Sequence, residues 1–145
     1  MKNKKLKLSE IINSGLDTRE DLNCSESILK AANTAYNMSL DKTSLKLAAG
    51  FGNGMGIEST CGAATGAVLA LSHLFVKEKG HESDYIGDLN REFMYNFEKK
   101  MGSLNCSFLK NEYRDPETRC RPIVYQAALL LESIIDRELK RRTTD

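Results

Sequence analysis

The sequence of 145 residues has no tryptophan, only two prolines and two histidines, and a formal net charge of just +1. The near-balance of charge argues against a nucleic-acid-binding protein, which would present a strongly basic face. No apolar run approaches the length of a transmembrane helix, so we expect no membrane insertion. Two histidines offer little to a serine–histidine–acid hydrolase, and we predict no catalytic residues. The lysine-rich start has no apolar stretch behind it, which predicts a cytoplasmic protein.

Strand signals are also nearly absent, whereas apolar residues recur at helical spacing along the chain. We therefore predict an all-α fold, a compact helical bundle of about five to six helices with a glycine-rich loop. The length fits a single domain over residues 1–145. The main helices are expected over residues 24–36, 42–49, 61–79, 85–101 and 122–141, with a short amphipathic one within residues 1–20.

The four cysteines are the most informative residues, because each is predicted at or directly before a helix start. They are Cys24, Cys61, Cys106 and Cys120. The expected caps are Asn23 (with Glu26 completing a capping box), Thr60, either Asn105 or Ser103, and, ahead of Pro122 as the first helical residue, Arg121. A helix start offers unpaired N–H groups and a positive dipole end, which favour thiolate over thiol. Four thiolates in one place repel each other, so they require a metal or protonation.

The cysteine spacing excludes the common short motifs, since no Cys-x-x-Cys pair is present. Zinc ribbons, thioredoxin-like dithiols and ferredoxin runs all depend on such closely spaced cysteines. A disulfide framework is not expected in the cytoplasm, where thiols are kept reduced. Metal binding, redox chemistry and plain burial stay open, and a shared site would have to be assembled by the tertiary fold.

A glycine-rich segment, residues 50–56, precedes Cys61 and has glycine at every second position, so no helix is expected there. It lacks the phosphate-loop pattern and a preceding strand. Glycine lets the backbone approach a centre held at Cys61 closely, and we therefore predict cofactor-binding roles for Gly52, Gly54, Gly56 and Gly62. Gly66 is expected only to allow close helix packing.

Together these elements resemble the C_GCAxxG_C_C family of four-cysteine redox-active proteins. The resemblance rests on Cys24 in Asn-Cys-Ser-Glu, the glycine-rich segment, Cys61-Gly62-Ala63-Ala64-Thr65-Gly66, Asn105-Cys106 and Cys120. It implies that Cys24, Cys61, Cys106 and Cys120 are the metal ligands of an iron–sulfur cluster, of either the 2Fe–2S or the 4Fe–4S type. The implied function is electron transfer or redox sensing rather than stand-alone catalysis.

Two alternatives remain. Four thiolates could instead hold zinc in an interaction module, because tetrahedral sulfur ligation suits zinc as well as iron. A thiol–disulfide redox enzyme would use Cys120, which lies between Arg119 and Arg121, as the activated thiol and Cys106 as its nearest partner in sequence. An electron carrier needs a redox partner protein, which the sequence does not identify, and a homodimer would shield an exposed cluster edge.

Overall fold

The computed structural model describes residues 5–82 and 84–144, and within them all regular elements are helical. The predicted all-α fold is confirmed, with eight α-helices in the described residues instead of five to six. They are α1 (Leu8–Asn13), α2 (Leu16–Arg19), α3 (Cys24–Ala35), α4 (Lys42–Lys46), α5 (Gly62–Phe75), α6 (Tyr85–Met101), α7 (Cys106–Tyr113) and α8 (Arg121–Thr144). None of these helices is apolar over a length that could cross a membrane.

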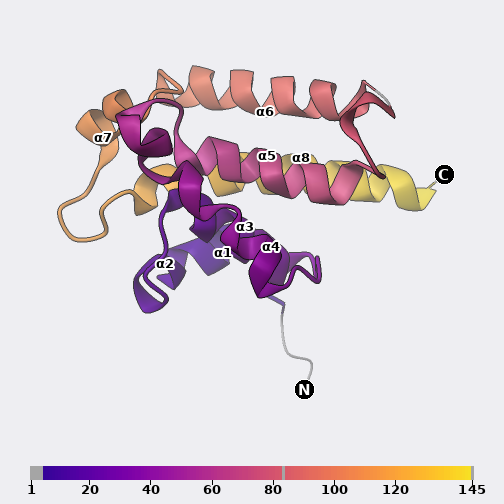
Figure 1. Ribbon diagram of the computed structural model, residues 1–145, viewed down its shortest axis with the longest axis horizontal. Coiled ribbons are helices and arrows are strands. Elements are labelled where there is room, and N and C mark those ends of the chain that lie inside the picture. The colour runs from indigo at the N-terminus through magenta and orange to yellow at the C-terminus, as the bar shows by residue number, and fades with distance from the viewer. Residues whose placement is uncertain (1–4, 83, 145) are drawn as a thin grey trace.

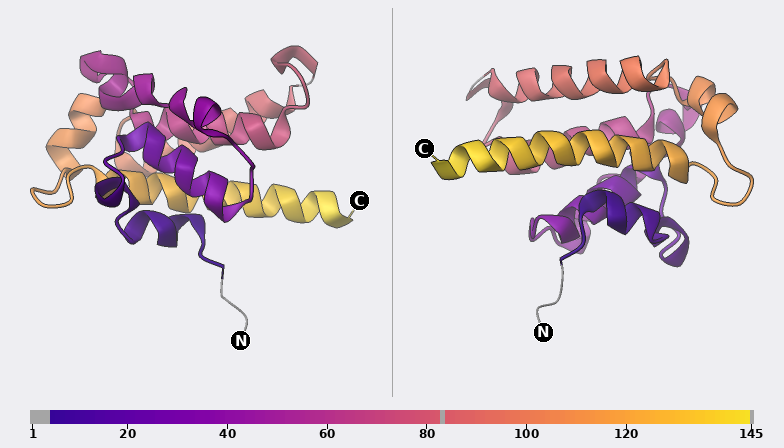
Figure 2. Two further views of the ribbon diagram at one scale, coloured as in Figure 1. Left: turned by 60° about the horizontal axis from the view of Figure 1, so that its bottom comes forward. Right: turned by 180° about the vertical axis from the view of Figure 1, so that it is seen from behind.

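Helix α8 lies in the middle of the bundle and contacts α1, α3, α5 and α6. Helices α5, α6 and α8 run along the long axis, and the N-terminal helices α1–α4 lie on the other side of α8 from α6 (Figures 1 and 2). The starts of α5 and α8 lie at the same end of the molecule, beside α7 (Figure 1). We refer to this as the α7 end.

The most extensive helix pair is α3 with α5, and small residues bring the two helices close together. A Cβ added to Gly66 on α5 would lie 2.8 Å from the carbonyl oxygen of Ser25 on α3. Ala63, Ala67 and Ala70 on α5 are fully buried. The predicted packing role of Gly66 is confirmed.

Two predicted helices end earlier than expected. The helix predicted over residues 61–79 ends at Phe75, because the backbone of Val76 is extended, with φ of −96° and ψ of 128°. The ring of Phe75 lies edge-on to that of Tyr85, with 6.1 Å between ring centroids. The helix predicted over residues 42–49 ends at Lys46 and is followed by the 3-10 turn η1 (Ala49–Phe51). The helix predicted over residues 85–101 has the observed bounds of α6.

The glycine-rich segment is wound into turns, so the expectation of a segment without helical structure was wrong in part. Besides η1 it contributes to the wide turn η2 (Gly54–Glu58), which Ser59 N closes by donating to the Gly54 carbonyl oxygen at 3.0 Å. Met55 and Gly56 within η2 have left-handed φ values of +60° and +82°. Such residues prevent a regular helix from continuing, and the segment stays a compact loop.

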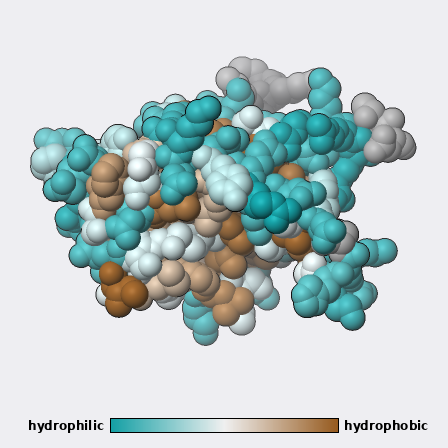
Figure 3. Space-filling view, turned by 90° about the horizontal axis from the view of Figure 1, so that it is seen from above, coloured by the Kyte–Doolittle hydropathy of each residue, from teal (hydrophilic) through white to brown (hydrophobic). Residues whose placement is uncertain are grey.

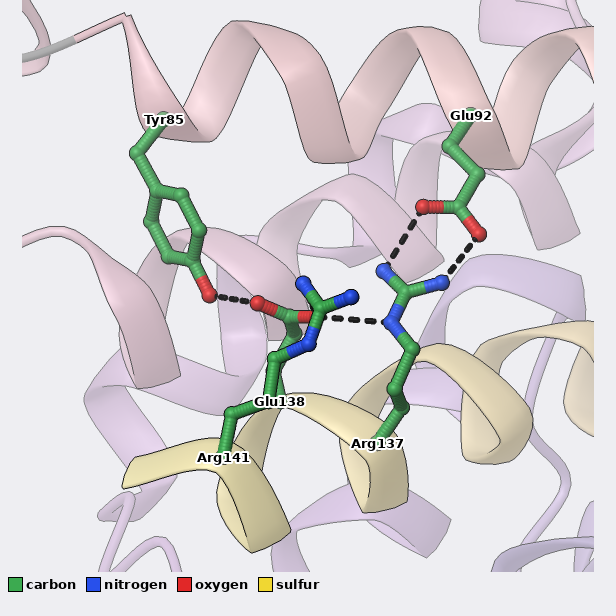
Figure 4. A network of polar contacts seen from close by, with 5 residues as sticks. All are labelled: Tyr85, Glu92, Arg137, Glu138 and Arg141. Carbon is green, nitrogen blue, oxygen red and sulfur yellow. Dashed lines mark hydrogen bonds and ion pairs between the residues drawn. The ribbon is translucent and has the colours of Figure 1, made fainter. Parts of the chain in front are cut away.

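A polar network joins α6 to the C-terminal half of α8 (Figure 4), whereas the start of α8 lies at the α7 end (Figure 1). Glu138 on α8 is only 2% exposed, and its carboxylate accepts hydrogen bonds from Tyr85, Arg137 and Arg141. Arg137 also donates two hydrogen bonds to Glu92, at 2.6 and 2.7 Å. Burial raises the pKa of Glu138, but these donors outweigh it and hold the pKa below its ordinary value.

Candidate four-cysteine site

All four cysteines lie at helix starts, as predicted. Cys24 and Cys106 are the first residues of α3 and α7, and Cys61 and Cys120 directly precede α5 and α8. The predicted capping box of α3 is present: Asn23 Oδ1 accepts from the amide of Glu26 at 3.0 Å, and Glu26 accepts from the amide of Asn23 at 2.9 Å. Helix placement therefore follows from local sequence at these positions.

Two of the predicted caps are wrong. Cys61 is itself the N-cap of α5, because Thr60 pairs instead with Asn105 in an antiparallel bridge. Arg121 is the first residue of α8. The carbonyl oxygen of Cys120 accepts hydrogen bonds from the amides of Ile123 and Val124 in that helix. The side chain of Arg121 turns away to form an ion pair with Asp17 at 3.0 Å.

Backbone hydrogen bonds hold two of the cysteines side by side. The amide of Cys61 donates to the carbonyl oxygen of Leu104 at 2.8 Å, and the amide of Cys106 donates to that of Ser59 at 2.5 Å. These bonds flank the bridge between Thr60 and Asn105. The starts of α5 and α7 are thus joined through main-chain groups, although their cysteines lie far apart in the sequence.

The four cysteines line one cavity of about 20 Å³, together with Asn53, Gly62, Leu109, Lys110 and Ile123. All four are free thiols; Cys61 and Cys106 are buried, whereas Cys24 and Cys120 are partly exposed. The cavity has room for about one water molecule. Within residues 5–82 and 84–144, no group of three or more potential ligand side chains is arranged as a metal site. The thiols therefore share one space without forming a ligand shell.

The four glycines predicted to bind a cofactor differ in their surroundings. A Cβ on Gly54 would overlap the nitrogen of Ser59 and lie 2.8 Å from Cβ of Cys106, and one on Gly62 would lie 3.4 Å from Cβ of Cys24. Gly52 packs against the side chain of Asn23, and no heavy atom lies within 4 Å of the position of a Cβ on Gly56. Gly54 and Gly62 therefore touch the cysteines directly, and the cofactor role of all four stays a prediction.

The thiols of Cys24 and Cys120 form a strongly interacting pair. Their mutual hydrogen bond, together with burial, raises the pKa of Cys24 far above its ordinary value. The same hydrogen bond lowers the pKa of Cys120 to about 6, and the positive charges of Arg114 and Lys110 act in the same direction, against burial. Cys120 is therefore the thiol of this pair that ionises first, with Cys24 as its hydrogen-bond donor.

The other two thiols are held in the neutral form. Burial raises the pKa of Cys61 to about 11, although the backbone amides of Ala63 and Ala64 at the start of α5 counteract it. Burial also raises the pKa of Cys106, and the charge of Lys110 opposes this. The helix starts thus favour thiolate as expected, but desolvation is the larger effect at these two positions.

Lys110 and Arg114 are functional candidates that the sequence analysis missed. Lys110 donates to Asn53, forms an ion pair with Glu58 at 3.4 Å and lines the cysteine cavity. The signal was present in the sequence, because these residues lie one and two helical turns after Cys106. The pairing of Cys120 with Cys24 also differs from the prediction, which chose Cys106 by nearness in sequence.

The α7 end also has an apolar surface. The large apolar residues Met55 and Ile57 on η2 and Phe108 on α7 are 44%, 79% and 42% exposed. On the face that carries α6, hydrophobic residues reach the surface in the middle and toward the α7 end, whereas the opposite end is mainly hydrophilic (Figure 3). The α7 end, at which the four cysteines lie, therefore exposes apolar side chains to the surroundings.

The chain matches the family described as "Putative redox-active protein (C_GCAxxG_C_C)" over residues 22–134. The chain belongs to this family. The matched residues include all four cysteines and the glycine-rich segment, so the C_GCAxxG_C_C match covers the whole site described above. Comparison with curated proteins and with solved structures finds no match.

Proposed function

We propose that this C_GCAxxG_C_C protein is an electron carrier or redox sensor whose four cysteines hold an iron–sulfur cluster. The observation that supports this proposal is the convergence of four free thiols, from four helix starts, on one cavity. Cysteine thiolates are the usual ligands of such clusters. No histidine, aspartate or glutamate among the described residues lines the cavity.

The donor set fits an iron–sulfur cluster, whereas the cavity as it stands fits only an object about the size of one water molecule. Binding a cluster therefore requires the thiols to rotate away from the cavity centre. Cys24 and Cys120 have the room to do so, because both also line the larger pocket beside the site. A bound cluster would supply one-electron transfer, and the helix starts and Lys110 would offset its negative charge.

Anaerobic purification followed by visible absorption, EPR and iron and sulfide analysis tests this proposal. We expect a coloured protein, and we expect Cys24→Ser, Cys61→Ser, Cys106→Ser and Cys120→Ser each to weaken or abolish the cluster. Gly50→Ala is the matched control, since Gly50 lies in the same glycine-rich segment, is not among the four glycines predicted to bind the cofactor, and has no heavy atom within 4 Å of an added Cβ. A colourless, iron-free protein that also resists reconstitution would overturn the cluster, and about one zinc per chain without iron would favour the interaction module.

The Cys24–Cys120 pair supports thiol–disulfide exchange as a second candidate function. The two thiols are mutual hydrogen-bond partners, are partly exposed and open onto a pocket. In this reaction a disulfide substrate is reduced to two thiols. The protein thiols lose two electrons and two protons, and an S–S bond forms between Cys24 and Cys120.

Peptide mapping of the metal-free protein after treatment with a small disulfide tests the second candidate. We expect a Cys24–Cys120 crosslink that Cys120→Ser abolishes and that Cys106→Ser leaves intact. A dominant Cys106–Cys120 crosslink would restore the pairing predicted from the sequence. The absence of any internal crosslink would reject exchange chemistry.

A further inference from the structure

A pocket of about 310 Å³ opens beside the small cysteine cavity, and Cys24, Asn53, Lys110 and Cys120 line both spaces. Its volume lies at the lower end of the range of small-molecule sites. The charged side chains around it are Lys110, Arg114, Arg119 and Arg121, with Asp17 as the single acidic residue. Four cations around one carboxylate make the pocket strongly positive.

Two of these cations make no hydrogen bond or ion pair with any described residue. Arg121 is neutralised by Asp17, and Lys110 by Glu58. The guanidinium groups of Arg114 and Arg119 form no hydrogen bond or ion pair anywhere in the part of the chain that the structure describes. Guanidinium groups bind carboxylate and phosphate through paired, charge-assisted hydrogen bonds, so these two are available to an anion.

A buried hydroxyl in the pocket wall gives a second, independent indication of a ligand. Ser27 lines the pocket and is 1% exposed, yet its Oγ has no hydrogen-bond partner. A buried polar group without a partner costs free energy, and such groups are usually satisfied by another molecule. An acceptor or donor oxygen on a small ligand would satisfy it.

We propose that this pocket binds a small molecule that carries a carboxylate or phosphate group, held by Arg114 and Arg119 and by the hydroxyl of Ser27. Helices α3 and α8 both start at the pocket, and their positive ends favour the same charge. The bound molecule would lie against Cys24 and Cys120. If the proposed redox function holds, the pocket defines its substrate or effector as a small anion; anion binding itself does not depend on that function.

Titration calorimetry on the reduced full-length chain tests the proposal, with inorganic phosphate in one arm and succinate in the other. The arm with the tighter binding identifies the preferred oxyanion. We expect Arg114→Gln and Arg119→Gln each to weaken binding about tenfold, through loss of a charged hydrogen bond. Arg91→Gln is the matched control, because Arg91 is an exposed arginine on α6 outside the pocket.

Serine variants test the site without changing its net charge, so a change in anion affinity cannot come from a general loss of positive charge. Ser27→Ala should weaken binding severalfold without lowering the midpoint of urea unfolding, because its hydroxyl has no hydrogen-bond partner among the described residues. Ser25→Ala is the control, since Ser25 is equally buried and unpartnered but packs against Gly66 and does not line the pocket. Equal weakening by Ser25→Ala, or by Arg91→Gln, would overturn the proposal, as would a lack of binding in both arms.

Metal analysis of the same preparations separates this proposal from the proposed function. Arg114, Arg119 and Ser27 are not among the proposed cluster ligands, so their variants should retain iron and sulfide. A protein that binds the anion but holds no iron contradicts the cluster alone. A protein that holds iron but binds neither phosphate nor succinate contradicts the anion site alone.

Discussion

Substituting Gly54 by alanine, with Gly56→Ala as its partner, separates backbone strain from crowding of the cysteine site. Both glycines lie in η2 and both have positive φ, +56° and +82°. They differ in what an added methyl group would meet: Ser59 and Cys106 at Gly54, and nothing within 4 Å at Gly56. Any difference between the two variants therefore reports packing against the site.

The magnitudes follow from this geometry. An alanine held in the left-handed region costs about 1–2 kcal/mol, which applies to both variants. Forcing a methyl group against Ser59 and Cys106 adds about 1–3 kcal/mol at Gly54 alone. We therefore expect Gly54→Ala to lose about 2–5 kcal/mol of unfolding free energy and Gly56→Ala about 1–2 kcal/mol. The larger loss is a substantial part of the total stability of an ordinary domain.

Urea unfolding followed by circular dichroism measures both losses, and alkylation of Cys106 in the folded protein reports on the site. Cys106 is only 7% exposed. We expect Gly54→Ala to speed its alkylation, because the methyl group would disrupt the hydrogen bond from the amide of Cys106 to the carbonyl oxygen of Ser59 and so expose the thiol. Gly56→Ala should leave its alkylation rate unchanged. The reasoning is refuted if the two variants agree within about 0.5 kcal/mol and alkylate Cys106 equally.

Three further outcomes are expected. Gly66→Ala should lower the free energy of unfolding in urea by about 1–3 kcal/mol, because its methyl group would clash with Ser25 and push α3 away from α5. An unchanged unfolding midpoint would contradict this packing. Asn23→Ala should lower the free energy of unfolding by about 1–2 kcal/mol, because it removes the capping box of α3. Asp41→Ala is the comparison: it removes the cap of α4, which has only five residues, and should lower the free energy of unfolding by less. Glu138→Gln should cost about 1–3 kcal/mol at pH 7. The pKa of Glu138 lies below its ordinary value of 4.5, so its carboxylate stabilises the protein fully at pH values above 4.5. The difference in unfolding free energy between the wild-type protein and Glu138→Gln should therefore shrink as the pH falls below 4.5. A difference that is constant with pH would contradict this.

Local signals in the sequence predicted a large part of this structure. The bounds of α6 follow from its apolar spacing and from Gly102, whose φ of +91° ends the helix. The start of α3 follows from the Asn23 capping box, and the cysteine positions at helix starts were predicted because capping residues precede three of them. Capping depends on neighbouring residues only, which makes it visible in a sequence.

The remaining features depend on tertiary contacts that no local pattern contains. Thr60 is a good capping residue, but its backbone pairs with Asn105, so that Cys61 becomes the cap. The positive charge of Arg121 was expected to favour the thiolate of Cys120, because the two residues are adjacent in the sequence. In the structure Arg121 instead forms an ion pair with Asp17 on α2. The partner of Cys120 is Cys24 for the same reason: proximity in the folded chain is decided by how α3 packs beside α8.

The proximity of Cys24 and Cys120 has a consequence for the lifetime of the folded protein. A shared ion or a covalent bond between them would tie together two points near opposite ends of the chain and close a loop of about 100 residues. Such a crosslink lowers the entropy of the unfolded chain and is worth about 4–5 kcal/mol by that estimate. Reduction or metal loss would release this tether, so the chemical state of the two sulfurs would also determine how readily the chain is degraded.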